Sequence, residues 1–170
     1  EVLNADDLAG AARHMEEASR HFRRAGIPWA HWGPIFRATF LWTQGTPRQA
    51  LQLLEQVPVE TLSPDYLHIR GRHLWTAASS LALLGRYDLT RELSRQALAA
   101  FTRAGEFEYL TVHHSYVAES SWMLGDRTGA WRELLAALPG VSRLPPVARR
   151  DAIPVRGAVF ALDDGLPEAA

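Results

Sequence analysis

The sequence predicts an all-α fold, and three observations support this prediction: a regular spacing of small residues, apolar stripes with helical spacing, and no competing strand pattern. Four glycines recur at intervals of 40 residues, and an alanine precedes each by seven residues: Gly45, Gly85, Gly125 and Gly165, with Ala38, Ala78, Ala118 and Ala158. A period of this length is typical of arrays of stacked supersecondary units. We therefore expect an array of about four helical repeats.

Each repeat has the pattern of two consecutive helices. In the second repeat, Ala78 and Leu81 share one helical face, and this apolar stripe ends at Gly85. Glycine readily adopts the left-handed conformation that terminates helices. A second stripe with helical spacing then covers residues 90–101. Because one hairpin cannot bury its apolar face alone, stacked hairpins forming an α-solenoid are expected.

The stripes and their stop signals predict seven helices in chain order: 6–25, 29–44, 47–57, 64–84, 87–104, 107–124 and 127–138. The prolines agree with these bounds, since three stand near helix starts and two follow helix ends: Pro28, Pro47 and Pro64, then Pro58 and Pro139. One more helix is expected between residues 149 and 162, where Pro154 starts it late or kinks it.

The same register predicts the domain organisation. Complete hairpins are expected at about 29–57, 64–104 and 107–138, with half-repeats at 1–26 and 145–170. Because both half-repeats lie at chain ends, we expect residues 1–170 to form a single repeat domain that is a segment of a longer array.

Composition and charge narrow the classes of function. The 170 residues include 18 Lys+Arg, 19 Asp+Glu and no cysteine, for a net charge of -1. This balance argues against nucleic acid or an anionic membrane surface as a direct partner. The basic cluster of Arg20, Arg23 and Arg24 has acidic neighbours that largely cancel its charge. No apolar run approaches the ~20 residues of a membrane span, and we expect a cytoplasmic protein.

No pattern indicates catalysis, a metal site or a cofactor. The sequence has no nucleophile elbow, phosphate-binding loop, zinc-protease motif or dinucleotide-binding fingerprint, and it lacks strands on which to place them. His14, Glu17 and His21 share a helical face, but flanking arginines favour a solvated surface over a metal site. Asp163-Asp164-Gly165 is interpreted as a polar turn. We expect a protein that is not an enzyme.

The residues Leu84-Gly85-Arg86-Tyr87, with Thr90 and Ala97, resemble the tetratricopeptide repeat family. Gly125, Ala130 and Ala137 repeat the pattern, and the long 40-residue period is similar to that of the MalT-like modules of large bacterial signal-transduction ATPases and transcriptional activators. The resemblance implies a right-handed superhelix of antiparallel hairpins. It also implies binding or assembly without chemistry, with a protein, a peptide or a small effector held on the concave surface.

Carrying the family's groove positions onto this sequence gives nine candidate binding residues: Trp32, Thr39, Trp42, Arg72, Trp75, Ser79, Ser115, Glu119 and Trp122. Aromatic side chains beside an arginine are frequent anchors of interfaces. Chaperone-tail capture, which in this family needs several cations in the groove, is not expected, because Arg72 is the only one there.

Two interpretations of the tryptophans remain open, since the same rings serve either as a binding groove or as core buried between stacked hairpins. An alternative function also remains: a structural scaffold that self-associates into homo-oligomers and has no ligand groove.

Overall fold

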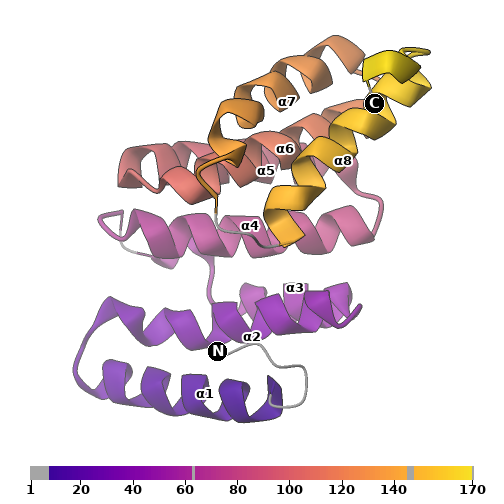
Figure 1. Cartoon of the computed structure of the whole chain (residues 1–170). Helices are drawn as coiled ribbons and strands as arrows, with labels where there is room; N and C mark the ends of the chain where they lie inside the picture. Colours follow the sequence, from indigo (N-terminus) through magenta and orange to yellow (C-terminus); the bar gives the residue numbers. More distant parts are fainter. Residues whose placement is uncertain (1–7, 63, 145–147, 170) are drawn as a thin grey trace. The chain divides into compact units, whose positions relative to one another are not determined.

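The computed structural model describes residues 8–62, 64–144 and 148–169, which are helical and contain no strand (Figure 1). The all-α prediction is therefore confirmed. The α-helices, which pack in adjacent pairs, are α1 Leu8–Arg24, α2 Trp32–Thr43, α3 Pro47–Glu55, α4 Leu67–Leu83, α5 Tyr87–Ala104, α6 Phe107–Met123, α7 Arg127–Val141 and α8 Ala148–Asp163. Short 3-10 helices are η2 Pro28–His31, η3 Val59–Thr61 and η4 Pro167–Ala169.

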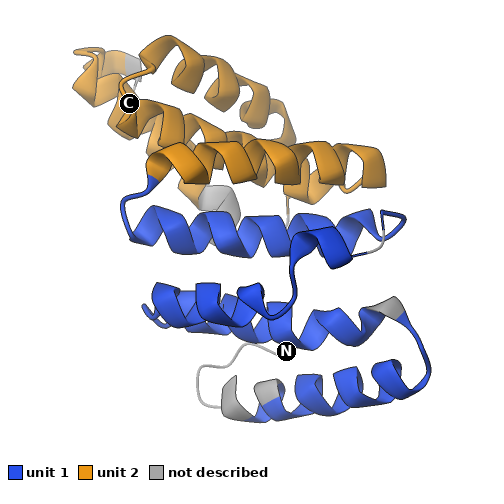
Figure 2. Cartoon of the chain, turned by 180° about the vertical axis from the view of Figure 1, so that it is seen from behind, with its two compact units in different colours: residues 1–86 blue, residues 87–170 orange. Residues whose placement is uncertain are grey.

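The chain divides into two compact units, residues 1–86 and 87–170 (Figure 2). In the first unit, α2 packs against α1, α3 and α4. In the second, α6 packs against α5, α7 and α8, and α7 also packs against α8. The division falls inside the hairpin predicted for 64–104, whose first helix belongs to one unit and whose second belongs to the other. The prediction of one continuous array over 1–170 stays a prediction.

The glycines of the 40-residue register end helices in the way the sequence predicts. Gly45, Gly85, Gly125 and Gly165 all have positive φ, between 72° and 80°. After Gly45, the N–H of Thr46 donates to the carbonyl of Leu41 at 2.9 Å, and the same six-residue closure follows the other three glycines. This hydrogen bond and the positive φ together define a Schellman cap. The repeat is therefore visible in the backbone as well as in the sequence.

Three of the four alanines of the register are buried, and Ala158 is half-buried. Ala38 and Ala118 are 0% exposed and Ala78 is 2% exposed. In the second unit, Ala118 of α6 and Ala130 of α7 lie in one apolar core with Ile153 of α8. A side chain the size of alanine allows helices to approach closely, which explains why small residues recur at these positions.

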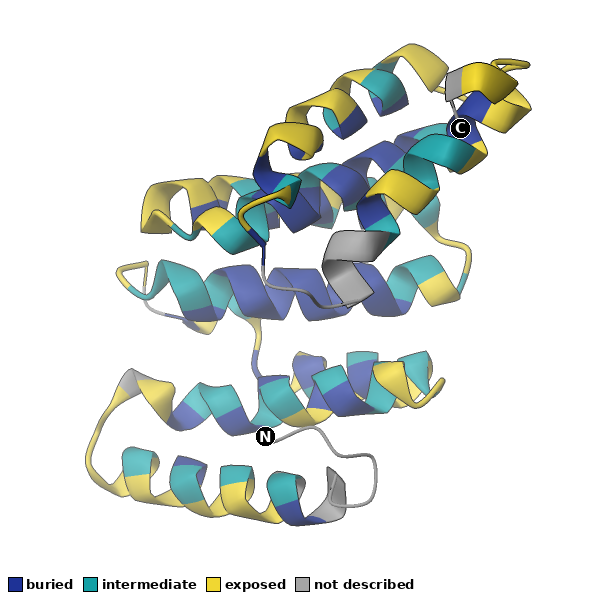
Figure 3. Ribbon diagram, in the orientation of Figure 1, coloured by how far each residue is buried: buried dark blue, intermediate teal, exposed yellow. Residues whose placement is uncertain are grey.

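Burial within each unit follows the helix pairs. The exposed residues of α1 lie on the side away from α2, whereas its half-buried and buried residues face α2 (Figure 3). This arrangement is that of an amphipathic helix covering its neighbour. Among the described residues, no helix has the length and apolar character needed to cross a membrane.

One proline prediction, that for Pro139, is wrong, and two other prolines differ in detail from their expected places. Pro139 does not follow the end of α7 but lies inside it, because the helix continues to Val141. Gly140 in that last turn packs against Thr111 of α6, so tertiary contact holds a turn that proline disfavours. Pro154 lies inside the last helix, which begins before it at Ala148, so it does not start this helix late, and a kink at Pro154 stays a prediction. Pro28 starts a 3-10 helix, and α2 begins only at Trp32.

Candidate functional site

In the first unit, aromatic rings surround one arginine in what we name the Arg72 cluster: Trp32 and Phe36 of α2 with Arg72 and Trp75 of α4. The Cζ atom of Arg72 lies 4.4 Å from the ring centroid of Trp75 and 5.6 Å from that of Trp32. Arg72 is only 7% exposed. The negative faces of the rings compensate part of the hydration that the guanidinium loses on burial.

The Arg72 cluster reaches the surface at Trp32. This half-buried ring stacks on His68 of α4 with 5.3 Å between centroids, and it lies edge-to-face with Trp29 of η2, with 5.5 Å between centroids. Trp29 is 38% exposed, whereas Trp75 is 5% exposed. Of the two predicted groove tryptophans in this cluster, Trp32 is half-buried and Trp75 is buried. The sequence analysis missed Trp29, because the groove positions carried over from the family begin at Trp32 in this hairpin.

Three further predicted residues of the first unit differ in their hydrogen bonding. The Thr39 hydroxyl lies 3.0 Å from the hydroxyl of Thr76, linking α2 to α4. The indole N–H of Trp42 and the hydroxyl of Ser79 are buried and have no hydrogen-bond partner among the described residues. A buried polar atom left without a partner costs about 1–3 kcal/mol.

In the second unit, Trp122 is held by contacts on both faces and at its edge. Its ring stacks on Phe160 of α8, with centroids 4.0 Å apart and planes 4° apart. The Arg127 Cζ lies 4.2 Å from the Trp122 centroid, and it must occupy the opposite face because Phe160 covers the first. The indole N–H donates to Asp163 at 3.3 Å. These contacts give Trp122 a packing role, and binding of a partner by this ring stays a prediction.

The Asp163-Asp164 turn has a larger part than the sequence indicates. Asp164 accepts a hydrogen bond of 2.7 Å from the indole N–H of Trp131 and pairs with Arg127 at 2.5 Å. The Trp131 hydrogen bond, followed by Arg127, lowers the pKa of Asp164, although desolvation opposes the shift. The turn therefore accepts hydrogen bonds from two tryptophans, which no local sequence signal reveals.

The other predicted residues of α6 are engaged within the second unit. The Ser115 hydroxyl donates to the carbonyl of Val112 at 2.8 Å, and Ser115 is 1% exposed. Glu119 pairs with Arg156 of α8 at 2.7 Å. Of the positions carried over to α6, Ser115 is thus bonded within its own helix, and Glu119 and Trp122 contact α8.

Within the described ranges, no group of three His, Cys, Asp or Glu side chains is arranged to hold a metal ion. His14 and His21 are exposed on α1.

Comparison of the chain with protein-family models, curated proteins and solved structures finds no match. The resemblance to tetratricopeptide repeats therefore rests on the sequence register.

Proposed function

We propose that this chain is a non-catalytic, tetratricopeptide-like binding module, with right-handed superhelical stacking of its hairpins, that serves as the sensor or assembly segment of a larger bacterial transcriptional regulator or signalling ATPase. Its partner is a protein or peptide segment held at the surface edge of the Arg72 cluster. The observation that carries the proposal is that exposed Trp29 and half-buried Trp32 adjoin a buried, ring-enclosed arginine.

The rigid placement of Trp32 favours binding of a partner because it lowers the entropic cost of association. Trp32 is already held by contacts with His68, Phe36 and Trp29, so little conformational entropy is lost when a partner covers its remaining surface. Tryptophan and arginine are also the residues most enriched among interface anchors. A rigid aromatic edge beside a cation suits an apolar or aromatic anchor on the partner.

Selection of peptides from a displayed library against the chain tests this proposal. Peptides that bind the proposed surface should lose about 10-fold or more in affinity with Trp29→Ala and with Trp32→Ala. Leu89→Ala is the matched control, because Leu89 is a similarly exposed apolar residue on α5 in the other unit. Selected peptides that bind all three variants and the original chain equally would contradict the proposal.

A second candidate function, a self-associating scaffold, is favoured by the surface of α8. Val155, Val159 and Leu162 lie on one helical face and are 61%, 48% and 59% exposed. One period earlier, the position of Val155 is occupied by Ser115, which is 1% exposed. Sedimentation at increasing concentration should show association that Val159→Glu abolishes, and a chain that stays monomeric throughout would exclude this function.

A further inference from the structure

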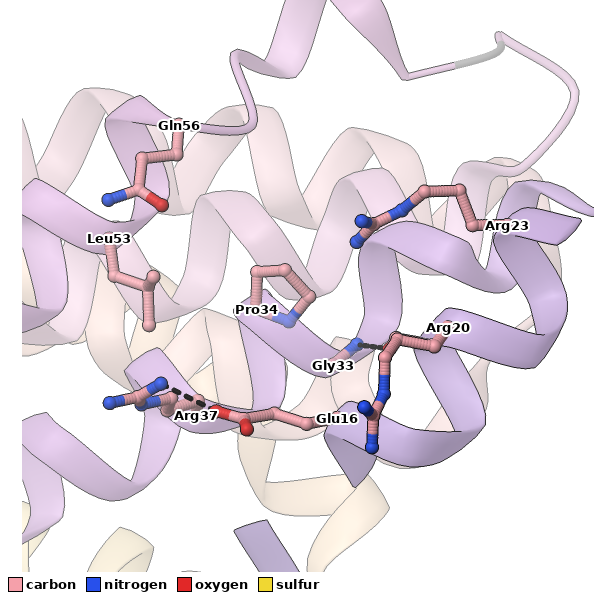
Figure 4. Close-up of a pocket in the computed structure, with 9 residues that line it drawn as sticks. Glu16, Arg20, Arg23, Gly33, Pro34, Arg37, Leu53 and Gln56 are labelled. Carbon is pink, nitrogen blue, oxygen red and sulfur yellow. Dashed lines mark hydrogen bonds and ion pairs between the residues drawn. The ribbon is translucent and has the colours of Figure 1, made fainter. Parts of the chain in front are cut away.

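The first unit contains a hollow of about 350 Å³ between α1, α2 and the end of α3 (Figure 4). Arg20 and Arg23 of α1 lie on one side of it, and Leu53 and Gln56 lie on the other, with Pro34 of α2 between them (Figure 4). Its volume is at the lower end of the range for small-molecule sites, roughly 300–1,000 Å³. None of the residues of the Arg72 cluster lines it.

A close approach of α1 and α2 forms the floor of this hollow. A Cβ atom at Gly33 would lie 2.1 Å from the Ser19 hydroxyl oxygen, so only glycine fits there without movement. The N–H of Gly33 donates to that oxygen at 2.9 Å, a contact drawn in Figure 4. Since the Ser19 oxygen acts as acceptor in this bond, its own hydroxyl proton remains a donor beside the hollow.

The charges around the hollow are unequal. Arg20, Arg23 and Arg37 line it, and Glu16 is the only carboxylate among the lining residues. Glu16 is already paired with Arg37 at 2.5 Å. The guanidinium groups of Arg20 and Arg23 make no hydrogen bond or ion pair with another side chain in the described part of the chain. The lining is thus net positive in a chain whose net charge is -1.

We propose that this hollow binds a small molecule carrying an oxyanion group, a phosphate or a carboxylate. Arg20 and Arg23 supply charge-assisted hydrogen bonds from guanidinium groups that pair with no carboxylate of the described residues. The Ser19 hydroxyl and the Gln56 amide add neutral donors, and Pro34 and Leu53 offer apolar contact to the rest of the molecule. The site is independent of the aromatic surface proposed above.

Titration calorimetry with inorganic phosphate and, separately, with succinate tests the site at constant ionic strength, because long-range attraction to exposed arginines is screened by salt. Saturable binding with a dissociation constant of ~10 mM or tighter is expected for at least one probe. The probe that binds more tightly identifies phosphate or carboxylate as the preferred group. Arg20→Gln with Arg23→Gln should weaken that binding about 10-fold or more.

Arg13→Gln with Arg24→Gln is the matched control, since it removes the same charge from exposed positions of α1 that do not line the hollow. The dissociation constant of this control variant for the same probe should stay within about twofold of that of the original chain. Equal weakening by both double variants would show general charge attraction and overturn the proposal. The absence of saturable binding by phosphate and by succinate would overturn it as well.

Discussion

The contact between Gly140 of α7 and Thr111 of α6 makes a sharp prediction about the second unit. A Cβ atom at position 140 would lie 2.0 Å from the Thr111 hydroxyl oxygen and 2.9 Å from its methyl carbon. Both residues are buried, and Thr111 is 4% exposed. A β-branched side chain is stiff about χ1, so Thr111 has little freedom to turn away. Gly140→Ala must therefore separate the two helices locally.

The magnitude follows from two opposing effects. Forcing an extra methyl into a packed contact costs about 1–3 kcal/mol. Alanine gains up to about 1 kcal/mol over glycine in helix propensity, and less than this near a helix end. We expect a net loss of about 1–2 kcal/mol, which for a chain of this size lowers Tm by roughly 2–8 °C.

A double-mutant cycle identifies the cause. Thr111→Ala removes the two nearest atoms and leaves only the Cβ of Thr111, which is 3.0 Å from the added methyl. The variant that carries both substitutions should lose less free energy of unfolding than the two single variants lose in sum, by about 1 kcal/mol or more. Thermal and urea unfolding followed by circular dichroism measure the four proteins. A Gly140→Ala variant as stable as the original, or strict additivity in the cycle, would refute the proposed steric conflict.

Two further predictions concern the first unit. Gly85 has a φ of 72°, and no atom lies within 4 Å of an added Cβ. Gly85→Val should therefore cost about 1–2 kcal/mol of stability through backbone strain alone, and Gly85→Asn should cost less. Equal melting temperatures for the two variants would contradict this prediction. Burial lowers the pKa of His73 below 6.5, although backbone hydrogen bonds to Leu54 and Val57 and the charge of Glu60 oppose the shift. Below pH ~6.5 the His73 side chain therefore binds a proton in the unfolded chain but not in the folded chain. The free energy of unfolding consequently decreases as the pH is lowered. His73→Gln should lose less stability than the original chain between pH ~7.5 and ~5.5, as urea unfolding at both pH values measures.

The helix ends could be predicted from the sequence because a glycine cap is a local feature. The positive φ of Gly45 or Gly125 depends on the absence of a side chain at that residue, and not on distant contacts. The continuation of α7 through Pro139 was missed for the opposite reason. It depends on the contact between Gly140 and Thr111, which are distant in sequence, and no local pattern reports such a contact.

The candidate sites were predicted only in part because their properties depend on partners in other helices. The register placed Trp32 and Arg72 at equivalent positions of consecutive repeats, and their side chains do meet. It did not indicate that Trp75 is buried or that Trp29 is exposed. The arginines at 20 and 23 were interpreted as neutralised by acidic neighbours along the sequence, whereas the folded helices place them at a hollow whose only carboxylate is already paired.

Contacts separated by about one period give the 40-residue repeat a physical meaning within each unit. In the first unit, hydroxyl groups of Thr39 and Thr76 link α2 to α4 across 37 residues. In the second, Glu119 and Arg156 link α6 to α8 across the same 37 residues. The linked helices are in each case the first helices of consecutive repeats, but the linking chemistry changes from paired hydroxyls to an ion pair. The repeat therefore preserves which helices pack together and leaves the side chains between them free to diverge, so that the rings around Arg72 in the first unit and those around Trp122 in the second have different neighbours.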